Sequence, residues 1–194
     1  MLEGLEATEI KLSQCVENKD YRIDSGFYTK APIINPHLSY KKIGDCLLSS
    51  QYGISVAMNE DKKGYPIYRM NEIHNLLCDL NVNKCADITQ EEAEIFKLHD
   101  KDVIFNRTNS FEWVGRTGIY YQNDNIDRIF ASYLVRFIPN ADILLPEYLT
   151  TYLNTKYGMW DIKRRARQSI NQTNVNPEEV KCTVSYTHLT LPTI

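Results

Sequence analysis

The sequence predicts an α+β fold, and three stretches carry that prediction. Residues 98–121 consist of two apolar runs separated by a polar cluster, which is typical of two β-strands joined by a loop. The segment Thr89-Gln90-Glu91-Glu92 has the pattern of a capping box and predicts a short helix that continues to Lys97. Pro146 suits the first position of a longer helix, because a proline there loses no helical hydrogen bond. We therefore expect strands and helices in the same domain.

Composition limits the possible functions. With 194 residues, of which 43% are hydrophobic, the chain can form one substantial core. Its formal net charge of −3 excludes a basic sheath that binds nucleic acid indiscriminately, so any DNA binding must come from local patches. One such patch lies between Lys156 and Asn176, where five cations and one aspartate give a net charge of +4. A solvated helix face would show the same charge pattern.

The five cysteines have no CxxC spacing and no histidines placed to complete a zinc site, so the sequence predicts no metal and reduced thiols. Reduced thiols are usual in the cytoplasm. The sequence also shows no signal peptide and no apolar span of about 18 residues. We accordingly expect a cytoplasmic protein that does not bind membranes.

In the first third of the chain, Glu9 to Val16 alternates enough to predict an opening strand, and Pro32 and Pro36 indicate a linker. Tyr40 to Leu48 is interpreted as a short helix or turn. The next stretch reads as a small-residue strand led by Tyr52-Gly53, a charged turn from Asn59 to Gly64, and a strand from Tyr65 to Met70. Because Pro66 cannot donate to a β-ladder, the last strand should start there or lie at an edge.

Further along, Val103 to Phe105 predicts a strand, Asn106 to Ser110 a polar turn, and Trp113 to Gly115 the start of the next strand. Arg128 to Phe137 predicts one long strand. The helix that begins at Pro146 should run to about Arg167 and pack through one apolar face, formed by Tyr148, Leu149, Tyr152, Leu153, Tyr157 and Trp160.

Several ordered blocks between about Ile10 and Cys182 resemble the target recognition domains of type I restriction-modification specificity (S) subunits. In this sequence the blocks read RIDSGFY from Arg22, YGIS from Tyr52, GYPIYRMN from Gly64, DVIFNR from Asp102, VGRTG from Val114, SYLVRF from Ser132 and SINQTNVN from Ser169. The resemblance implies one recognition domain with a mixed, mostly antiparallel curved sheet, flanked by short helices and a C-terminal amphipathic helix. Complete S subunits carry two such domains separated by long helices, whereas this chain has one domain and no coiled coil.

The function that this resemblance implies is sequence-specific binding of double-stranded DNA, with one half of a bipartite target read by this domain. Cleavage and methylation would belong to separate motor-nuclease and methyltransferase subunits, and a second recognition domain would read the other half. The chain itself would need no cofactor.

Three segments are expected to contact DNA: Gln51 to Arg69, Asn106 to Arg116, and Arg164 to Asn174. Amides and arginines read base edges, whereas other cations fix the position on the phosphates. The predicted reading residues are Gln51, Tyr52, Arg69, Asn106, Arg107, Thr108, Asn109, Ser110, Arg116, Asn171, Gln172 and Asn174. The predicted phosphate contacts are Lys62, Lys63, Arg164, Arg165 and Arg167.

Structural roles remain open for the same residues. Arg69 would serve equally as a salt-bridge partner at the edge of the core, and the amides of residues 168–174 are ordinary turn formers. The cations Lys163, Arg164 and Arg167 would also stabilise the C-terminal end of a helix through its dipole. Residues 106–110 would suit a plain hairpin with a polar turn.

Two matches to a metal-nuclease pattern occur, Asp45 with Glu60-Asp61-Lys62 and Asp161 with Glu179-Val180-Lys181. Both lie in turn-like contexts, and two matches in one short chain show that the pattern is weak. No methyltransferase tetrapeptide or Gly-rich cofactor loop is present, so we expect no catalysis. Two other hypotheses are a recognition domain detached from a fused restriction-methylation enzyme and a protein-interaction module.

At Thr183 the family pattern stops. One reading frame for Val184 to Thr193 matches a transposon-type sequencing-library adapter, so we expect residues 1–182 to form the domain and residues 183–194 to be a read-through tail. A short native β-tail is the alternative.

Overall fold

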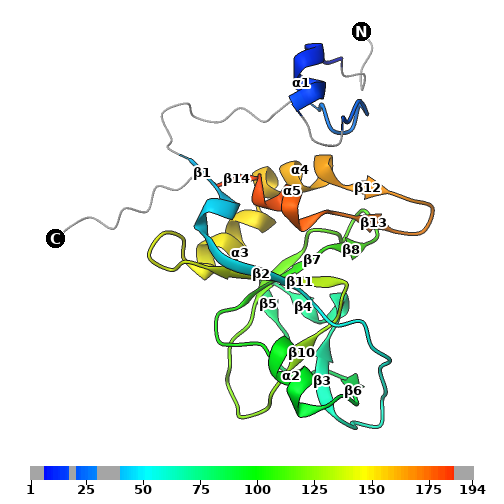
Figure 1. The fold of residues 1–194 in the computed structure, drawn as a ribbon, viewed down its shortest axis with the longest axis vertical. Coiled ribbons are helices and arrows are strands. Elements are labelled where there is room, and N and C mark those ends of the chain that lie inside the picture. The colour runs from blue at the N-terminus through cyan, green and yellow to red at the C-terminus, as the bar shows by residue number, and fades with distance from the viewer. Residues whose placement is uncertain (1–6, 18–20, 30–39, 186–194) are drawn as a thin grey trace, which may run out of the picture. The chain divides into compact units, whose positions relative to one another are not determined.

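The computed structural model describes residues 7–17, 21–29 and 40–185, and divides into two compact units, Met1–His37 and Leu38–Ile194 (Figure 1). The linker predicted at Pro32 and Pro36 lies outside the described residues.

The described part of the first unit contains one helix, α1 (Leu12–Glu17), so the strand predicted for Glu9 to Val16 is wrong. The side chain of Gln14 explains the difference, because its Oε1 accepts a 2.8 Å hydrogen bond from the backbone N–H of Lys11. Such a local side-chain bond satisfies a backbone donor that a strand would have to pair with another strand.

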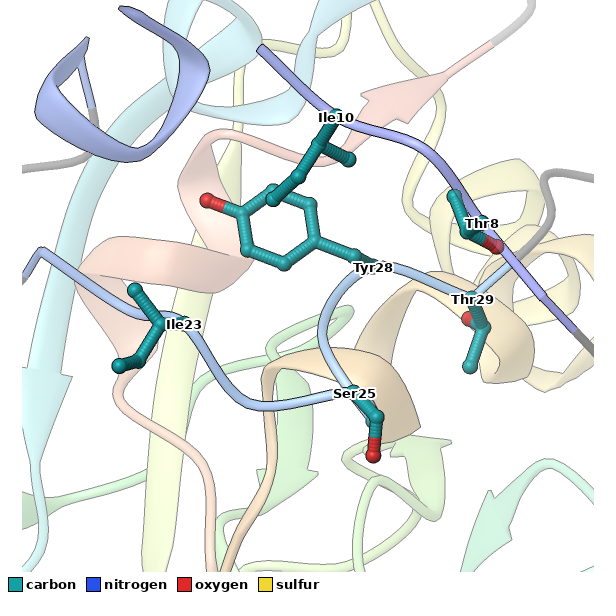
Figure 2. Close-up of a pocket in the computed structure, with 7 residues that line it drawn as sticks. Thr8, Ile10, Ile23, Ser25, Tyr28 and Thr29 are labelled. Atoms are coloured by element: carbon teal, nitrogen blue, oxygen red, sulfur yellow. The ribbon is translucent and has the colours of Figure 1, made fainter. Parts of the chain in front are cut away.

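Residues 21–29 of this unit form a tight turn around Asp24. Its carboxylate accepts hydrogen bonds from the Arg22 guanidinium at 2.8 and 3.0 Å and from the Phe27 N–H at 3.0 Å, and the Arg22 guanidinium holds the pKa of Asp24 below its usual value. The turn borders a hollow of about 510 Å³. Figure 2 shows its neutral lining, which consists of Thr8, Ile10, Ile23, Ser25, Gly26, Tyr28 and Thr29.

The second unit is built on a six-stranded sheet with the order β2-β11-β7-β9-β5-β4. The strands are β2 (Leu47–Tyr52), β11 (Leu134–Pro139), β7 (Val103–Asn106), β9 (Thr117–Ile119), β5 (Leu77–Cys78) and β4 (Ile73–His74). Neighbours pair antiparallel except β5 and β9, which are parallel. The predicted α+β class with a mixed, mostly antiparallel sheet is therefore confirmed.

The hairpin predicted for residues 98–121 is confirmed by the antiparallel pairing of β7 and β9, with Val103 opposite Ile119. Its second strand begins at Thr117 and not at Trp113. The reason is a turn, in which the carbonyl of Ser110 accepts from the N–H groups of Trp113 and Val114 at 3.1 and 2.9 Å.

A smaller sheet has the order β10-β3-β6, formed by β10 (Ile129–Phe130), β3 (Tyr65–Tyr68) and β6 (Cys85–Ala86). β3 begins at Tyr65 and is the central strand of this sheet, so the expectation that it starts at Pro66 or lies at an edge is wrong. The proline is tolerated because β10 pairs only with Ile67 and Tyr68, which follow it. The single strand predicted from Arg128 to Phe137 is wrong. The Ala131 N–H donates to Tyr68 of this sheet, and the Ala131 carbonyl accepts from the Leu134 N–H, so the chain leaves β10 and turns into β11 of the main sheet.

The capping box before α2 (Gln90–Phe96) is confirmed, because Thr89 Oγ1 accepts from the Glu92 N–H at 3.2 Å and the Glu92 carboxylate accepts from the Thr89 N–H at 3.0 Å. The turn predicted within Tyr40 to Leu48 is the 3-10 helix η1 (Ile43–Cys46), which leads into β2. A second 3-10 helix, η2 (Met70–Glu72), precedes β4.

The helix predicted from Pro146 to about Arg167 is two helices, α3 (Pro146–Asn154) and α4 (Lys156–Arg165). Pro146 begins α3 as expected. Thr155 adopts an extended backbone, with ψ 164°, and its Oγ1 accepts from the Gly158 N–H at 3.2 Å, so it caps α4 and ends the continuous helix. A short helix, α5 (Pro177–Lys181), follows near the end.

None of the described helices is long and apolar enough to cross a membrane.

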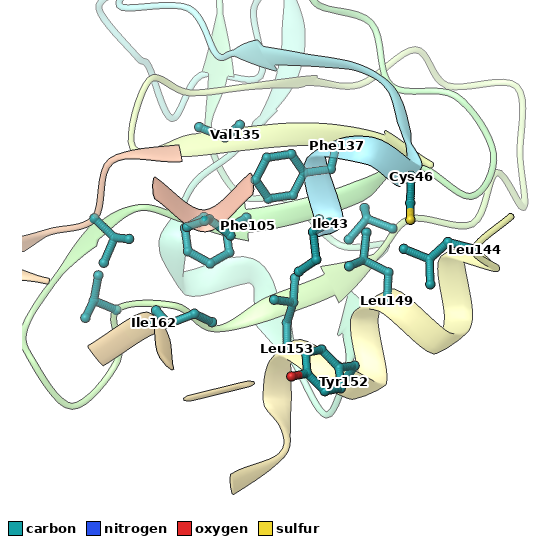
Figure 3. Packing of buried hydrophobic residues seen from close by; sticks show 14 of the residues in the cluster. Ile43, Cys46, Phe105, Val135, Phe137, Leu144, Leu149, Tyr152, Leu153 and Ile162 are labelled. Carbon is teal, nitrogen blue, oxygen red and sulfur yellow. The ribbon is translucent and has the colours of Figure 1, made fainter. Parts of the chain in front are cut away.

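The largest core cluster lies where α3, α4 and η1 cover one face of the main sheet (Figure 3). Phe105 of β7 and Phe137 of β11 pack with ring centroids 5.6 Å apart. Leu149 and Leu153 of α3 and Ile162 of α4 are completely buried against them. Tyr157, which we expected on the packing face, remains 43% exposed. Because this core joins β7 to α4, it fixes the chain segments that leave both elements.

The predicted tail is described only as far as Ser185. The Thr183 carbonyl accepts from the Ile43 N–H at 2.9 Å, and the Tyr152 hydroxyl donates to the Val184 carbonyl at 2.5 Å. Strand β14 (Val184–Ser185) pairs antiparallel with β1 (Lys41–Lys42). The first residues after Cys182 therefore pack on the domain, while the origin of the tail stays a prediction.

Candidate nucleic-acid interface

Two of the three segments predicted to contact DNA lie side by side in a three-stranded sheet with the order β12-β13-β8 (Figure 1). Strands β12 (Arg167–Gln168) and β13 (Thr173–Asn174) form a hairpin, and β13 pairs antiparallel with β8 (Thr108–Asn109). We call the exposed side chains of residues 109–116 and 163–172 the hairpin surface.

The strand β8 is attached to the hairpin by hydrogen bonds that leave little polar surface free. The Thr108 hydroxyl donates to Asn174 Oδ1 at 2.6 Å, and the Val175 N–H donates to the Arg107 carbonyl at 2.9 Å. Thr108 is 5% exposed and Asn106 is completely buried. Because a buried side chain cannot touch a ligand, neither residue is available to read bases in this structure, and both position the strand instead.

The hairpin ends in an exposed tip. The Ser169 N–H donates to the Gln172 carbonyl at 2.9 Å, and the Ser169 hydroxyl donates to the same oxygen at 3.1 Å, so Ile170 and Asn171 occupy the turn. The side chains from Gln168 to Gln172 are all exposed. The predicted reading residues Asn171 and Gln172 are therefore accessible, and their amide groups point to a polar ligand surface.

Beside the hairpin, the turn from Ser110 to Gly115 rests on α4. Gly115 has a positive φ of 90°, and a Cβ at this position would lie 2.7 Å from a side-chain carbon of Ile162. A larger residue would therefore push the turn away from the helix. The side chain of Asn109 accepts from the Ser110 N–H at 2.8 Å and remains half-buried, while Ser110 is exposed.

The same turn carries two aromatic side chains that contact cations. The Arg116 guanidinium lies 3.8 Å from the ring centroid of Trp113, and the Lys163 ammonium lies 5.0 Å from that of Phe111. Phe111 and Trp113 are 42% and 44% exposed. Sequence reasoning missed Phe111, Trp113 and Lys163 as site residues, although aromatics next to polar turn residues were a signal for them.

The predicted phosphate contacts of the hairpin surface differ in accessibility. Arg164 and Arg165 both donate to the Asp161 carboxylate, at 2.5 and 3.2 Å, and Arg164 also packs over Trp160 with 5.0 Å to the ring centroid. Arg165 has only 12% of its side chain exposed. Arg167 is 56% exposed and lies 3.5 Å from the Glu179 carboxylate. Arg167 is thus better placed than Arg165 to reach an anion.

In the remaining segment predicted to contact DNA, Gln51 to Arg69, several side chains form hydrogen bonds and ion pairs within the domain. Gln51 donates to the Ile95 carbonyl at 2.9 Å and accepts from Arg136. Arg69 lies 2.6 Å from Glu72, so its interpretation as a salt-bridge partner is confirmed. Tyr52 contacts the residue just before β8, because the Arg107 guanidinium lies 5.2 Å from its ring centroid. Arg107 also donates to the Ser132 carbonyl at 3.5 Å.

Lys62 and Lys63 lie in the exposed turn before β3. Lys62 has a positive φ of 58°, and Lys63 lies 2.5 Å from the Asp87 carboxylate. A hydrogen bond to Asp87 raises the pKa of Lys63. The turn from Asn59 to Gly64 lies next to the smaller sheet and has no net charge, because Glu60 and Asp61 balance the two lysines.

Within the described ranges, we find no group of three or more His, Cys, Asp or Glu side chains that could hold a metal ion. The described fold and surface define an α+β domain that presents exposed amides, cations and aromatic rings on a hairpin and an adjoining turn. Such a surface suits recognition of a polar partner.

Comparison with known proteins gives one consistent answer. The chain is 29% identical over 154 residues to the putative type I restriction enzyme MjaX specificity subunit of Methanocaldococcus jannaschii. That match covers 78% of this chain and 34% of the MjaX subunit. It is 24% identical over 151 residues to the type I restriction enzyme EcoKI specificity subunit of Escherichia coli K12. That match covers 76% of this chain and 32% of the EcoKI subunit. No protein-family model matches the chain.

One solved structure, from work on complex assembly and conformational transition of the type I R-M system, has the same fold with a TM-score of 0.52. It is 13% identical and the match covers 90% of this chain and 38% of that one. The chain thus spans about a third of the length of the curated relatives that it matches. Its similarity to type I restriction enzyme specificity subunits, which the sequence blocks predicted, is confirmed.

Proposed function

We propose that this chain is a target recognition domain that binds double-stranded DNA and reads one half of a bipartite site, as part of a specificity subunit. The observation that carries the proposal is the pairing of β13 with β8, which brings two segments selected independently from the sequence into one surface. The similarity to specificity subunits supports the same role.

The hairpin would enter the major groove of the DNA. The major groove of B-form DNA, about 12 Å wide, admits a two-stranded β-ribbon, and β12 and β13 form such a ribbon with an exposed tip. Asn171 and Gln172 at the tip have the amide groups that pair with adenine, and Arg116 on the adjoining turn has the guanidinium that pairs with guanine.

Phosphate contacts would come from the cations around this ribbon. Arg167 lies at the base of the ribbon, and Lys163 lies on α4 over the ring of Phe111. Lys62 and Lys63 would contribute where DNA reaches the smaller sheet. Gln51, Asn106 and Thr108 would act indirectly, by holding the strands that carry the reading residues. Cations on phosphates fix the register of the protein on DNA, whereas base-edge contacts supply the sequence preference.

We further propose that the domain has no catalysis of its own and acts with methyltransferase and motor-nuclease subunits and a second recognition domain. In both matches to the nuclease pattern, carboxylates are paired with cations of the domain. Glu60 binds Lys84, and Asp161 binds Arg164 and Arg165. Carboxylates held in this way are poorly prepared to share a magnesium ion.

Selection from random duplexes tests the proposal. The purified chain should enrich one short asymmetric motif, and binding to that motif should weaken as salt rises, because DNA binding releases counterions. Enrichment of no motif, or equal retention of all duplexes, would contradict sequence reading. Binding to a partner protein without any DNA preference would favour the interaction-module hypothesis instead.

A further inference from the structure

The side chain of Ile170 is 100% exposed at the tip of the β12–β13 hairpin. Hairpin tips are usually built from polar residues or glycine, and polar side chains interact well with water. A β-branched apolar residue at this point gains nothing from burial within its own domain. Its presence is accounted for if Ile170 loses its contact with water when a ligand binds.

Single apolar residues on a surface are common, but the surroundings of Ile170 are unusual. Its neighbours are polar, with Ser169 before it and Asn171 and Gln172 after it, and all of them are exposed. The double hydrogen bond from Ser169 to the Gln172 carbonyl holds the tip in shape. The pairing of β13 with β8 ties the hairpin to the domain, so the tip presents one aliphatic group and two amides together.

This combination matches one kind of base pair. In the major groove an A·T pair offers the N6 and N7 groups of adenine to an amide, and the 5-methyl group of thymine to an apolar side chain. A G·C pair offers no methyl group. Building on the proposed function, we infer that Ile170 contacts a thymine methyl while Asn171 or Gln172 pairs with adenine, so that the tip selects A·T base pairs.

Replacing thymine by deoxyuridine tests the inference, because it removes the methyl group and leaves every hydrogen bond of the base pair in place. In the duplex selected by the wild-type chain, each thymine is replaced in turn and the dissociation constant is measured. One replacement should weaken binding by about fourfold, the effect of returning one methyl-sized group to water. The other replacements should have little effect.

The same duplexes are then bound to Ile170→Ala, which should not distinguish thymine from deoxyuridine at the sensitive position. Ile143→Ala is the matched control, because Ile143 is also an exposed isoleucine, at 41%, but lies outside the hairpin surface. It should show the full fourfold loss. Equal melting temperatures of the three proteins would establish that folding is unchanged.

The outcomes separate the inference from the proposed function. If a motif is enriched but no thymine replacement affects the wild-type chain, or if Ile170→Ala keeps the fourfold loss, the inference is wrong while sequence reading stands. If no motif is enriched at all, the proposed function is contradicted, and the inference falls with it.

Discussion

The hydroxyl of Thr108 donates a 2.6 Å hydrogen bond to the side-chain oxygen of Asn174, which lies 66 residues further along the chain. The bond crosses from β8 to β13 and adds a side-chain link to the backbone pairing of the two strands. It therefore couples the turn that carries Trp113 to the hairpin that carries Asn171.

Replacing Thr108 by valine should destabilise the domain. The substitution keeps the shape of the side chain but removes its donor, so the oxygen of Asn174 loses its partner beside a buried position, at a cost of about 1–3 kcal/mol in the free energy of unfolding. Urea unfolding measures the change. Thr151→Val is the control, because Thr151 donates to Glu147 on an exposed helix face, and it should stay within about 0.5 kcal/mol. Equal stability of both variants would mean that the Thr108 bond is unimportant.

A second prediction concerns acid stability and the buried Arg128. Its guanidinium donates to the Asp124 carboxylate at 2.7 and 2.8 Å, and this contact lowers the pKa of Asp124 to about 2. Since the pKa of an unfolded aspartate is about 3.9, the contact stabilises the fold fully above pH 4 and loses its effect as the pH falls towards 2.

Asp124→Asn should therefore lower the melting temperature most above pH 4, and the difference from the wild-type chain should shrink near pH 2. Thermal unfolding followed from pH 2 to 7 measures this difference. Asp61→Asn, at an exposed carboxylate, is the control. A difference that stays constant over the whole range would show that Asp124 does not contribute through its charge.

The end of the domain can be located by truncation. Because Val184 and Ser185 pair with β1, and Tyr152 donates to Val184, a chain that stops at Cys182 should lose about 1–3 kcal/mol of stability. A chain that stops at Ser185 should match the full chain within about 0.5 kcal/mol, if the remaining residues are a read-through tail. Loss of stability on removal of residues 186–194 would identify that segment as native and packed.

A fourth prediction is that the chain neither cleaves nor methylates DNA. Incubation with Mg²⁺, or with S-adenosylmethionine, and mixed-sequence duplexes should yield no product. Product formation that is abolished by Glu60→Ala or Glu179→Ala would overturn the view that this domain only reads DNA.

Local patterns in the sequence predicted much of the fold. The capping box at Thr89, the proline start at Pro146 and the hairpin of β7 and β9 depend on residues close in sequence, and all are confirmed. The errors had two causes. Alternating residues at Leu12 form a helix where Gln14 bonds locally to Lys11, and the run from Arg128 to Phe137 divides between two sheets because Ala131 pairs with Tyr68.

In the candidate site, too, local features could be predicted and contacts with distant residues could not. The amides of Asn171 and Gln172 could be selected from composition alone, because their segment is rich in polar turn residues. The burial of Asn106 and the double engagement of Gln51 could not, because Asn106 pairs with Leu134 and Gln51 bonds to Ile95 and Arg136, all of which are distant in sequence. The pairing of β8 with β13 was equally hidden, since two-residue strands leave almost no periodic signal.

The central claim, that the hairpin tip reads bases while nearby cations hold phosphates, is tested most directly by comparing Asn171→Ala with Arg167→Ala on the selected duplex and its single-base variants. Asn171→Ala should cost about 1–3 kcal/mol on the selected site and relax the preference at one position. Arg167→Ala should weaken all sequences alike and reduce the slope of log affinity against log salt by about one unit. If Asn171→Ala leaves the selected motif intact and weakens every sequence equally, the tip does not read bases and the account is contradicted.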